Sequence, residues 1–158
     1  MHKRDNAIKD ITSPEILEEI IKLCPVCHVA LFDETYPYLL GFNFGYSNKS
    51  IYLHCTKEGK KIDLLRKNNH VCVYFDTDHE IFARNTPVAC SWRMKYRSVQ
   101  AFGKAFFVDD YNEKLAALHI FMANYTSQTF SYSTPAVNNI QIIRIDIEQW
   151  QGRSFEYN

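Results

Sequence analysis

The sequence of 158 residues lacks an excess of charge of either sign, because 18 Lys and Arg residues balance 18 Asp and Glu residues. A chain without net charge has no overall field that would attract a nucleic-acid backbone or an anionic membrane. No run approaches the roughly 20 apolar residues of a membrane span, and the N-terminal MHKRDNAIKD has no apolar core typical of a signal peptide. We therefore expect a cytoplasmic protein with no nucleic-acid or membrane partner.

The sequence also lacks an even set of cysteines. Its five cysteines are scattered along the chain, at positions 24, 27, 55, 72 and 90. This pattern is poor material for a disulfide framework and is typical of a reducing compartment. The motif CPVCH could supply three of the four ligands of a zinc ion, but no second ligand pair follows it. We interpret Cys24 and Cys27 as buried thiols and expect no metal, and structural zinc is the alternative that metal analysis would test.

Hydrophobic periodicity predicts several strands with helices between them. The expected helices cover about Pro14–Lys22, Lys57–Lys67 and the stretch from Asp109 or Asp110 through Met122. The expected strands are CHVALFD and YPYLLGFNFGY, which form a hairpin, and then IYLHC, VCVYFD, MKYRSVQAFGKAFFVDD and IQIIRIDI. We expect a bend or bulge at Gly103 and irregular structure from Thr77 to Ser91.

This order of elements predicts a mainly β, α+β fold rather than a βαβ sheet. Antiparallel strands with inserted helices favour a closed or split antiparallel β-barrel with peripheral helices. The length suits one core, so we expect a single domain over residues 1–158. Aromatic residues make up 15% of the chain, which suits a β-rich core or a flat-walled pocket.

Two adjacent lysines, Lys60 and Lys61, begin a predicted helix directly after Gly59. The start of a helix is already electropositive, so lysines there oppose the helix dipole. They could be solvated surface charges, as most lysine pairs are. A strand end, a short glycine loop, free backbone amides and two ammonium groups also make a cradle for a phosphate, although the spacing is not that of a nucleotide P-loop.

His54 and Cys55 end the predicted strand IYLHC. Neighbouring residues on a strand point to opposite faces, so these two side chains cannot form the hydrogen-bonded pair of a Cys–His nucleophile. His54 could simply be a half-buried strand residue. It is also the best candidate in the chain for a proton donor.

The blocks HCTKEGKKIDLLRKNNHVCVYFD and KYRSVQAFGKAFFVDDYNEKLAALHIFMANY, together with the hairpin PYLLGFNFGY, resemble a known family. They are similar to the FMN-binding split-barrel proteins related to pyridoxamine 5′-phosphate oxidase, and within them to the group of 5-nitroimidazole resistance proteins. The resemblance covers about Ile16–Ile147. It implies a homodimer with two FMN molecules in clefts between the subunits.

The resemblance also implies which residues contact the flavin. In the family an Arg-Lys pair after the third strand meets the flavin phosphate, and this pair falls on Lys60 and Lys61. Two stretches would border the flavin ring and the ribityl chain, partly through backbone groups: Leu40, Gly41, Phe42 and Asn43, and His54, Cys55 and Thr56. Two further residues, Ser98 and Trp150, would contact the flavin from other strands.

The sequence departs from the oxidases at two places. Leu40 replaces an arginine of their second strand, and their C-terminal Arg-Leu-His-x-Arg signature is absent after Trp150, where the chain reads QGRSFEYN. Oxidation of pyridoxamine phosphate is therefore not expected. The resemblance implies instead an FMN-dependent oxidoreductase, nitroimidazole-reductase-like, that reduces a small-molecule acceptor. The alternative is a flavin or haem binding and storage protein of the same fold without turnover.

Overall fold

The computed structural model describes residues 8–157. The strands are β1 (Ile8–Ile11), β2 (Cys27–Leu31), β3 (Tyr38–Phe42), β4 (Gly45–Ser47), β5 (Ser50–Cys55), β6 (His70–Ala83), β7 (Trp92–Val108) and β8 (Gln141–Phe155). The helices are α1 (Pro14–Leu23), α2 (Lys60–Lys67), α3 (Tyr111–Ala123) and α4 (Thr134–Asn138), and a 3-10 turn, η1, covers Ala89–Ser91.

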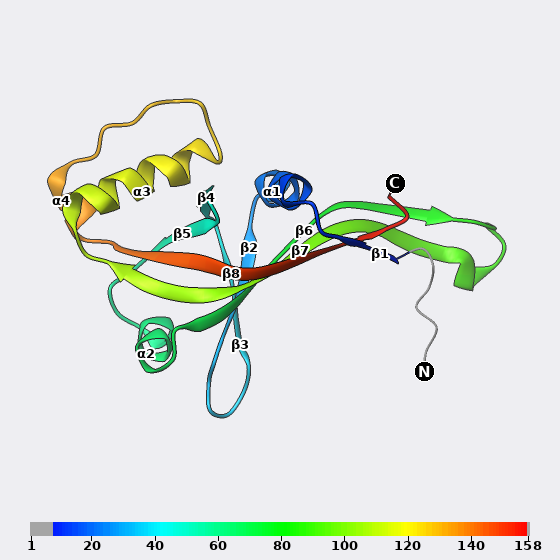
Figure 1. The fold of residues 1–158 in the computed structure, drawn as a ribbon, viewed down its shortest axis with the longest axis horizontal. Coiled ribbons are helices and arrows are strands. Elements are labelled where there is room, and N and C mark those ends of the chain that lie inside the picture. Colours follow the sequence, from blue (N-terminus) through cyan, green and yellow to red (C-terminus); the bar gives the residue numbers. More distant parts are fainter. Residues whose placement is uncertain (1–7, 158) are drawn as a thin grey trace.

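Within residues 8–157, all eight strands join one sheet in the order β3-β2-β6-β7-β8-β5-β4, with β1 added to β8, and every pairing is antiparallel. Figure 1 shows the long strands β6, β7 and β8 crossing the molecule, with α3 and α4 at one end and the β6–β7 hairpin extending at the other. Because β3 and β4 are not paired with each other, the sheet is not closed. The predicted mainly β fold with a split barrel and peripheral helices is confirmed.

The main core fills the inside of this curved sheet and the space beneath α1 and α2. Its largest fully buried side chains include Phe44, Phe75, Leu17 and Ile20. Amphipathic patterning explains the placement, because the apolar stripe of each helix and alternate residues of each strand face inward. A second cluster, around Val137, lies where α3 and α4 cover the other end of β8.

The structure corrects four boundaries. The expected strand YPYLLGFNFGY is divided into β3 and β4, and β4 pairs with β5 rather than with β2. The stretch Thr77–Ser91 is not irregular throughout, because β6 continues to Ala83 and pairs with β7 after a register shift between Thr77 and Glu80. The polar run at this bulge hides the strand alternation in the sequence. Helix α2 begins at Lys60 rather than Lys57, since Gly59 is its N-cap. The last strand runs on to Phe155 and therefore contains Trp150.

The expected irregularity at Gly103 is confirmed. The pairing of β7 with β8 shifts register between Phe102 and Gly103. A Cβ atom on Gly103 would overlap the carbonyl oxygen of Asp146 on the neighbouring strand. The absence of a side chain is thus what allows the two backbones to approach at the bulge.

We predict that Gly103→Ala lowers the free energy of unfolding by about 1–3 kcal/mol, because the new methyl group must push β8 away. Denaturant unfolding of the cofactor-free protein measures the change. The matched control is Gly41→Ala on β3, where a Cβ would meet only the ring of His28 at 3.9 Å. Equal losses in the two variants would contradict the proposed backbone contact.

Candidate functional site

Three of the predicted segments meet at the open side of the barrel. Phe42 at the end of β3, Leu53 near the end of β5 and Lys61 at the start of α2 border one small cavity of about 10 Å³. Its other walls are apolar core residues such as Val29 and Ile145, so it shows that the three segments are close but has no room for a ligand. Leu40, Gly41 and Asn43 flank Phe42, and His54, Cys55 and Thr56 follow Leu53. Sheet order alone would separate these strands, since β3 and β5 lie near opposite edges, but curvature of the sheet brings them together.

The start of α2 has an uncommon construction. Its N-cap, Gly59, has a backbone φ of 121° and offers no side-chain acceptor to the first turn. The hydroxyl of Thr56 donates to the Glu58 carbonyl at 2.9 Å, which shapes the preceding loop. A helix start without a side-chain cap keeps its electropositive character and suits a bound anion.

The two lysines of this first turn have different surroundings. Lys60 Nζ lies 2.6 Å from Asp33 Oδ2 and 4.7 Å from the centroid of the Tyr38 ring. The hydrogen bond between the two side chains lowers the pKa of the Asp33 carboxyl and raises the pKa of the Lys60 ammonium. Lys61 instead faces the cavity between β3 and β5. Burial raises the pKa of the Cys55 thiol, and the charge of Lys61 partly offsets the increase.

His54 lies beside the C-terminal end of α3. Its ring packs edge-on against Phe121, with the centroids 4.6 Å apart. Partial burial in this contact lowers the pKa of His54, so its imidazole is mainly neutral at neutral pH. The other edge of the residue remains exposed. His54 can therefore offer both a donor and an acceptor nitrogen to a molecule bound beside α3, on the opposite face of β5 from the cavity that Leu53 borders.

Tyr125, which follows α3, is a residue of the site that the sequence did not reveal. Its hydroxyl accepts a hydrogen bond from the backbone N–H of Phe44 at 2.8 Å and donates to the Pro25 carbonyl at 2.9 Å. It thereby ties the end of α3 to the segment between β3 and β4. The spacing of Phe121 and Tyr125, four residues apart, was the available signal, but it is equally typical of core packing.

Ser98 and Trp150 lie apart from this group. Ser98 is buried in the middle of β7, where it borders a polar groove with Tyr74, Gln100 and Arg153 on the solvent-facing side of the sheet. Trp150 on β8 packs against the main core, with Lys49 Nζ 5.0 Å from its ring centroid. Within one subunit, neither position adjoins the cavity between β3 and β5.

A larger cavity of about 470 Å³ lies between the loop that follows β2 and the solvent-facing side of β6 and β7. The sequence did not predict it. Its walls are mostly apolar and aromatic, including Phe32, Tyr36, Val71 and Phe102. Asp33, the partner of Lys60, also borders this cavity, so the same loop contacts both the cavity and the start of α2.

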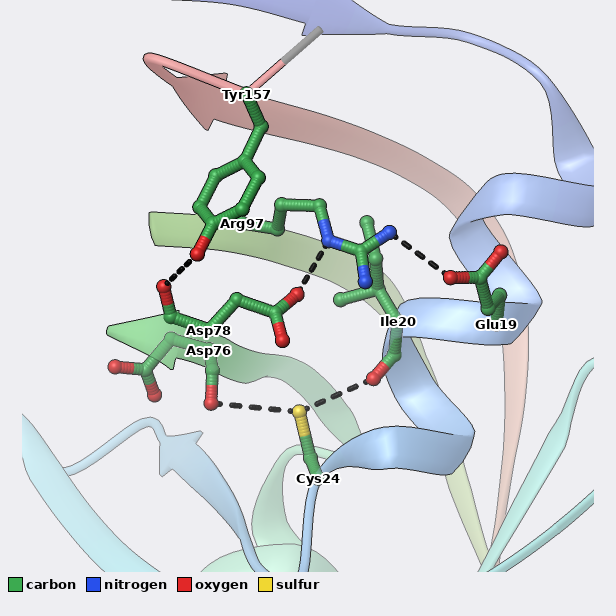
Figure 2. A network of polar contacts seen from close by, with 7 residues as sticks. All are labelled: Glu19, Ile20, Cys24, Asp76, Asp78, Arg97 and Tyr157. Atoms are coloured by element: carbon green, nitrogen blue, oxygen red, sulfur yellow. Dashed lines mark hydrogen bonds and ion pairs between the residues drawn. The ribbon is translucent and has the colours of Figure 1, made fainter. Parts of the chain in front are cut away.

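Cys24 and Cys27 are buried, and burial raises the pKa of each thiol to about 12. Figure 2 shows the Cys24 thiol donating to the carbonyls of Ile20 and Asp76, beside the ion pairs of Arg97 with Asp78 and Glu19. This network joins α1 to the bulge of β6. In the part of the chain that the structure describes, no three His, Cys, Asp or Glu residues gather in a way that could hold a metal ion.

The sequence matches the family model described as pyridoxamine 5′-phosphate oxidase over residues 13–154. No protein of curated function matches it significantly. A solved structure from Bacteroides thetaiotaomicron VPI-5482, whose proposed role is 5-nitroimidazole antibiotic resistance, is 36% identical in sequence. The alignment covers 98% of this chain and 95% of that chain, with a TM-score of 0.84.

Two more distant structures share the fold. The FAD and haem binding protein from Mycobacterium smegmatis is 18% identical, with a TM-score of 0.81 over 94% of this chain and 74% of that chain. The flavocytochrome Anf3 from Azotobacter vinelandii is 17% identical, with a TM-score of 0.79 over 94% of this chain and 70% of that chain.

Among residues 8–157, no helix is long and apolar enough to cross a membrane.

We predict that the pKa of His54 lies below the ordinary value of about 6.5 and that Phe121→Ala raises it toward that value, because the substitution returns water to the ring. Titration of the imidazole C–H signals by NMR measures both values, with His54→Gln used to assign the resonance. An unchanged pKa in Phe121→Ala would show that this contact does not desolvate the ring.

Proposed function

Because the chain belongs to the pyridoxamine 5′-phosphate oxidase family, we propose that it binds FMN and acts as an FMN-dependent oxidoreductase that reduces a small-molecule acceptor. The observation that carries this proposal is the 36% identity, over nearly the full length of both chains, to the Bacteroides protein with a proposed role in 5-nitroimidazole resistance. An aromatic nitro compound is the acceptor class that this likeness suggests.

The residues at the open side of the barrel fit a flavin phosphate. The first turn of α2 has no side-chain cap, and Lys61 has no ion-pair partner among residues 8–157. The ammonium of Lys61 and the amides of this turn would hold the phosphate. Backbone groups of Leu40–Asn43 and of His54–Thr56 would border the ribityl chain and the ring, with Asn43 and His54 as side-chain hydrogen-bond partners.

A bound flavin supplies the transfer of reducing equivalents, while the protein orients it and excludes competing reactions. His54 is the catalytic candidate because it can donate or accept a proton at the exposed edge of its ring. Its position depends on Phe121, which in turn depends on the anchoring of the end of α3 by Tyr125.

The proposal includes a homodimer. An apolar row crosses four strands on the solvent-facing side of the sheet. It consists of directly paired residues: Leu39, Ala30, Cys72 and Phe102. Leu39 is 60% exposed and Phe102 is 40% exposed, and Phe32 beside them is 62% exposed. Ser98 lies on the same side of β7, so a partner packed there would bring its own Ser98 toward a flavin held by the first subunit.

A second candidate is a flavin or haem carrier without turnover. The fold-level likeness to the FAD and haem binding protein and to the flavocytochrome favours it. Both candidates use the same binding residues, so they differ only in whether the reduced cofactor passes its electrons to an acceptor.

Anaerobic reduction separates the two candidates. We predict that flavin-loaded protein, reduced with NADH or NADPH or otherwise with dithionite, is reoxidised by a 5-nitroimidazole faster than free FMN at the same concentration. The flavin absorbance in the visible range reports the change. Reoxidation no faster than that of free FMN would favour the carrier, and absence of flavin binding would refute both candidates.

The homodimer gives a separate prediction. An obligate interface should bury more than about 2,000 Å² in total, and light scattering at micromolar concentration should give the mass of two chains. We expect Phe32→Glu to shift the mass toward that of one chain, because it places a charge beside the apolar row of Leu39, Ala30, Cys72 and Phe102. The matched control is Ile81→Glu on the β6–β7 hairpin, which is exposed to nearly the same extent, 63%. A monomeric mass for the unmodified protein would contradict the dimer.

A further inference from the structure

The two lysines at the start of α2 do not share one environment. Adjacent residues of a helix point about 100° apart, since there are 3.6 residues per turn. Lys60 extends toward the loop between β2 and β3, where it meets Asp33 and the ring of Tyr38. Lys61 extends toward the cavity that Phe42 and Leu53 border.

The charge that each lysine can offer to an anion is therefore different. Asp33 holds Lys60 at 2.6 Å, and only 17% of the Asp33 side chain is exposed, so the carboxylate largely cancels the charge of Lys60. A phosphate approaching Lys60 would also be repelled by Asp33. In the described part of the chain no carboxylate pairs with Lys61, so its charge is not cancelled.

The contacts of Lys60 have a different effect, because they join α2 to the β2–β3 loop. Lys67, at the other end of α2, makes a second and longer contact with Glu34 of the same loop, at 3.8 Å. β3 begins directly after this loop, so the loop lies next to the strand that carries Leu40–Phe42. The ring of Tyr38, the first residue of β3, also contacts Lys60.

We propose that the lysine pair divides two tasks: Lys61 selects the phosphate of the flavin, while Lys60, held by Asp33, anchors the β2–β3 loop to α2. The inference rests on the proposed flavin site. It departs from the symmetrical role that the family's Arg-Lys pair implies. Asp33 becomes a positioning residue, because it acts on the site through Lys60 and through backbone hydrogen bonds with Glu34 and Thr35 of the loop.

Binding measurements test the first task. Cofactor-free protein is titrated with FMN and with riboflavin, which has the same ring and no phosphate, and flavin fluorescence gives both affinities. Lys61→Gln should weaken FMN about ten-fold to a hundred-fold while leaving riboflavin nearly unchanged, as expected for one charge-assisted hydrogen bond. Lys60→Gln combined with Asp33→Asn, which removes both charges of the pair, should change both affinities by the same factor. Asp33→Asn should tighten FMN relative to riboflavin, because it frees the charge of Lys60.

Hydrogen exchange of the cofactor-free protein tests the second task without any ligand. Exchange of the backbone amides in residues 32–36 should rise in Lys60→Gln and in Asp33→Asn but not in Lys61→Gln. The circular dichroism spectrum of each variant checks that the fold is kept.

The results can also overturn the proposal. A selective loss of FMN affinity that is equal in Lys61→Gln and in the double variant Lys60→Gln with Asp33→Asn would show that both lysines hold the phosphate. Equal exchange of the loop in all three variants would show that Lys60 does not anchor it. If the unmodified protein bound neither flavin, the proposed function would fail, and the exchange data would still decide whether Lys60 anchors the loop.

Discussion

The pairing of β7 with β8 is the constraint on which the rest of the fold depends. The two strands pair from Tyr96 and Phe155 at one end to Val108 and Ile142 at the other. β6 adds to the free edge of β7 and β5 to that of β8, so each half of the barrel is built outward from this central pair. The bulge at Gly103 bends the pair in its middle. Curvature of this kind turns the outer strands toward each other without joining them.

The open side of the barrel follows from that curvature. A closed barrel would satisfy the backbone groups at the edges of β3 and β4, whereas a split barrel leaves room for a ligand between two strands. Lys61 comes from the first turn of α2, and Phe121 from the last turn of α3 contacts His54. Because Leu53 and His54 are neighbours on β5, the cavity that Lys61 borders and the ring of His54 lie on opposite faces of that strand.

The start of α2 shows how local instability can accompany function. Two lysines and a glycine N-cap are unfavourable for an isolated helix, because they add positive charge where the dipole is already positive. The structure compensates one of the two charges with Asp33 and leaves the other uncompensated. An anion at this end of α2 would restore the balance. Residues that contradict a local rule in this way are expected at functional sites.

The sequence by itself determined the element types, the antiparallel class and the position of the bulge at Gly103, because periodicity and glycine placement are local properties. It also determined the family, through blocks that carry the lysine pair and the long β7 strand. It did not determine where β6 ends, since the polar bulge near Asp78 hides the alternation. Only the tertiary structure decided that Lys60 faces Asp33 while Lys61 faces the cavity, and that Phe121 and Tyr125 complete the site. The contacts of Phe121 and Tyr125 join residues that are far apart in the chain. The two lysines are identical neighbours that differ only in the direction of their side chains. Local sequence pattern encodes neither long-range contacts nor side-chain direction.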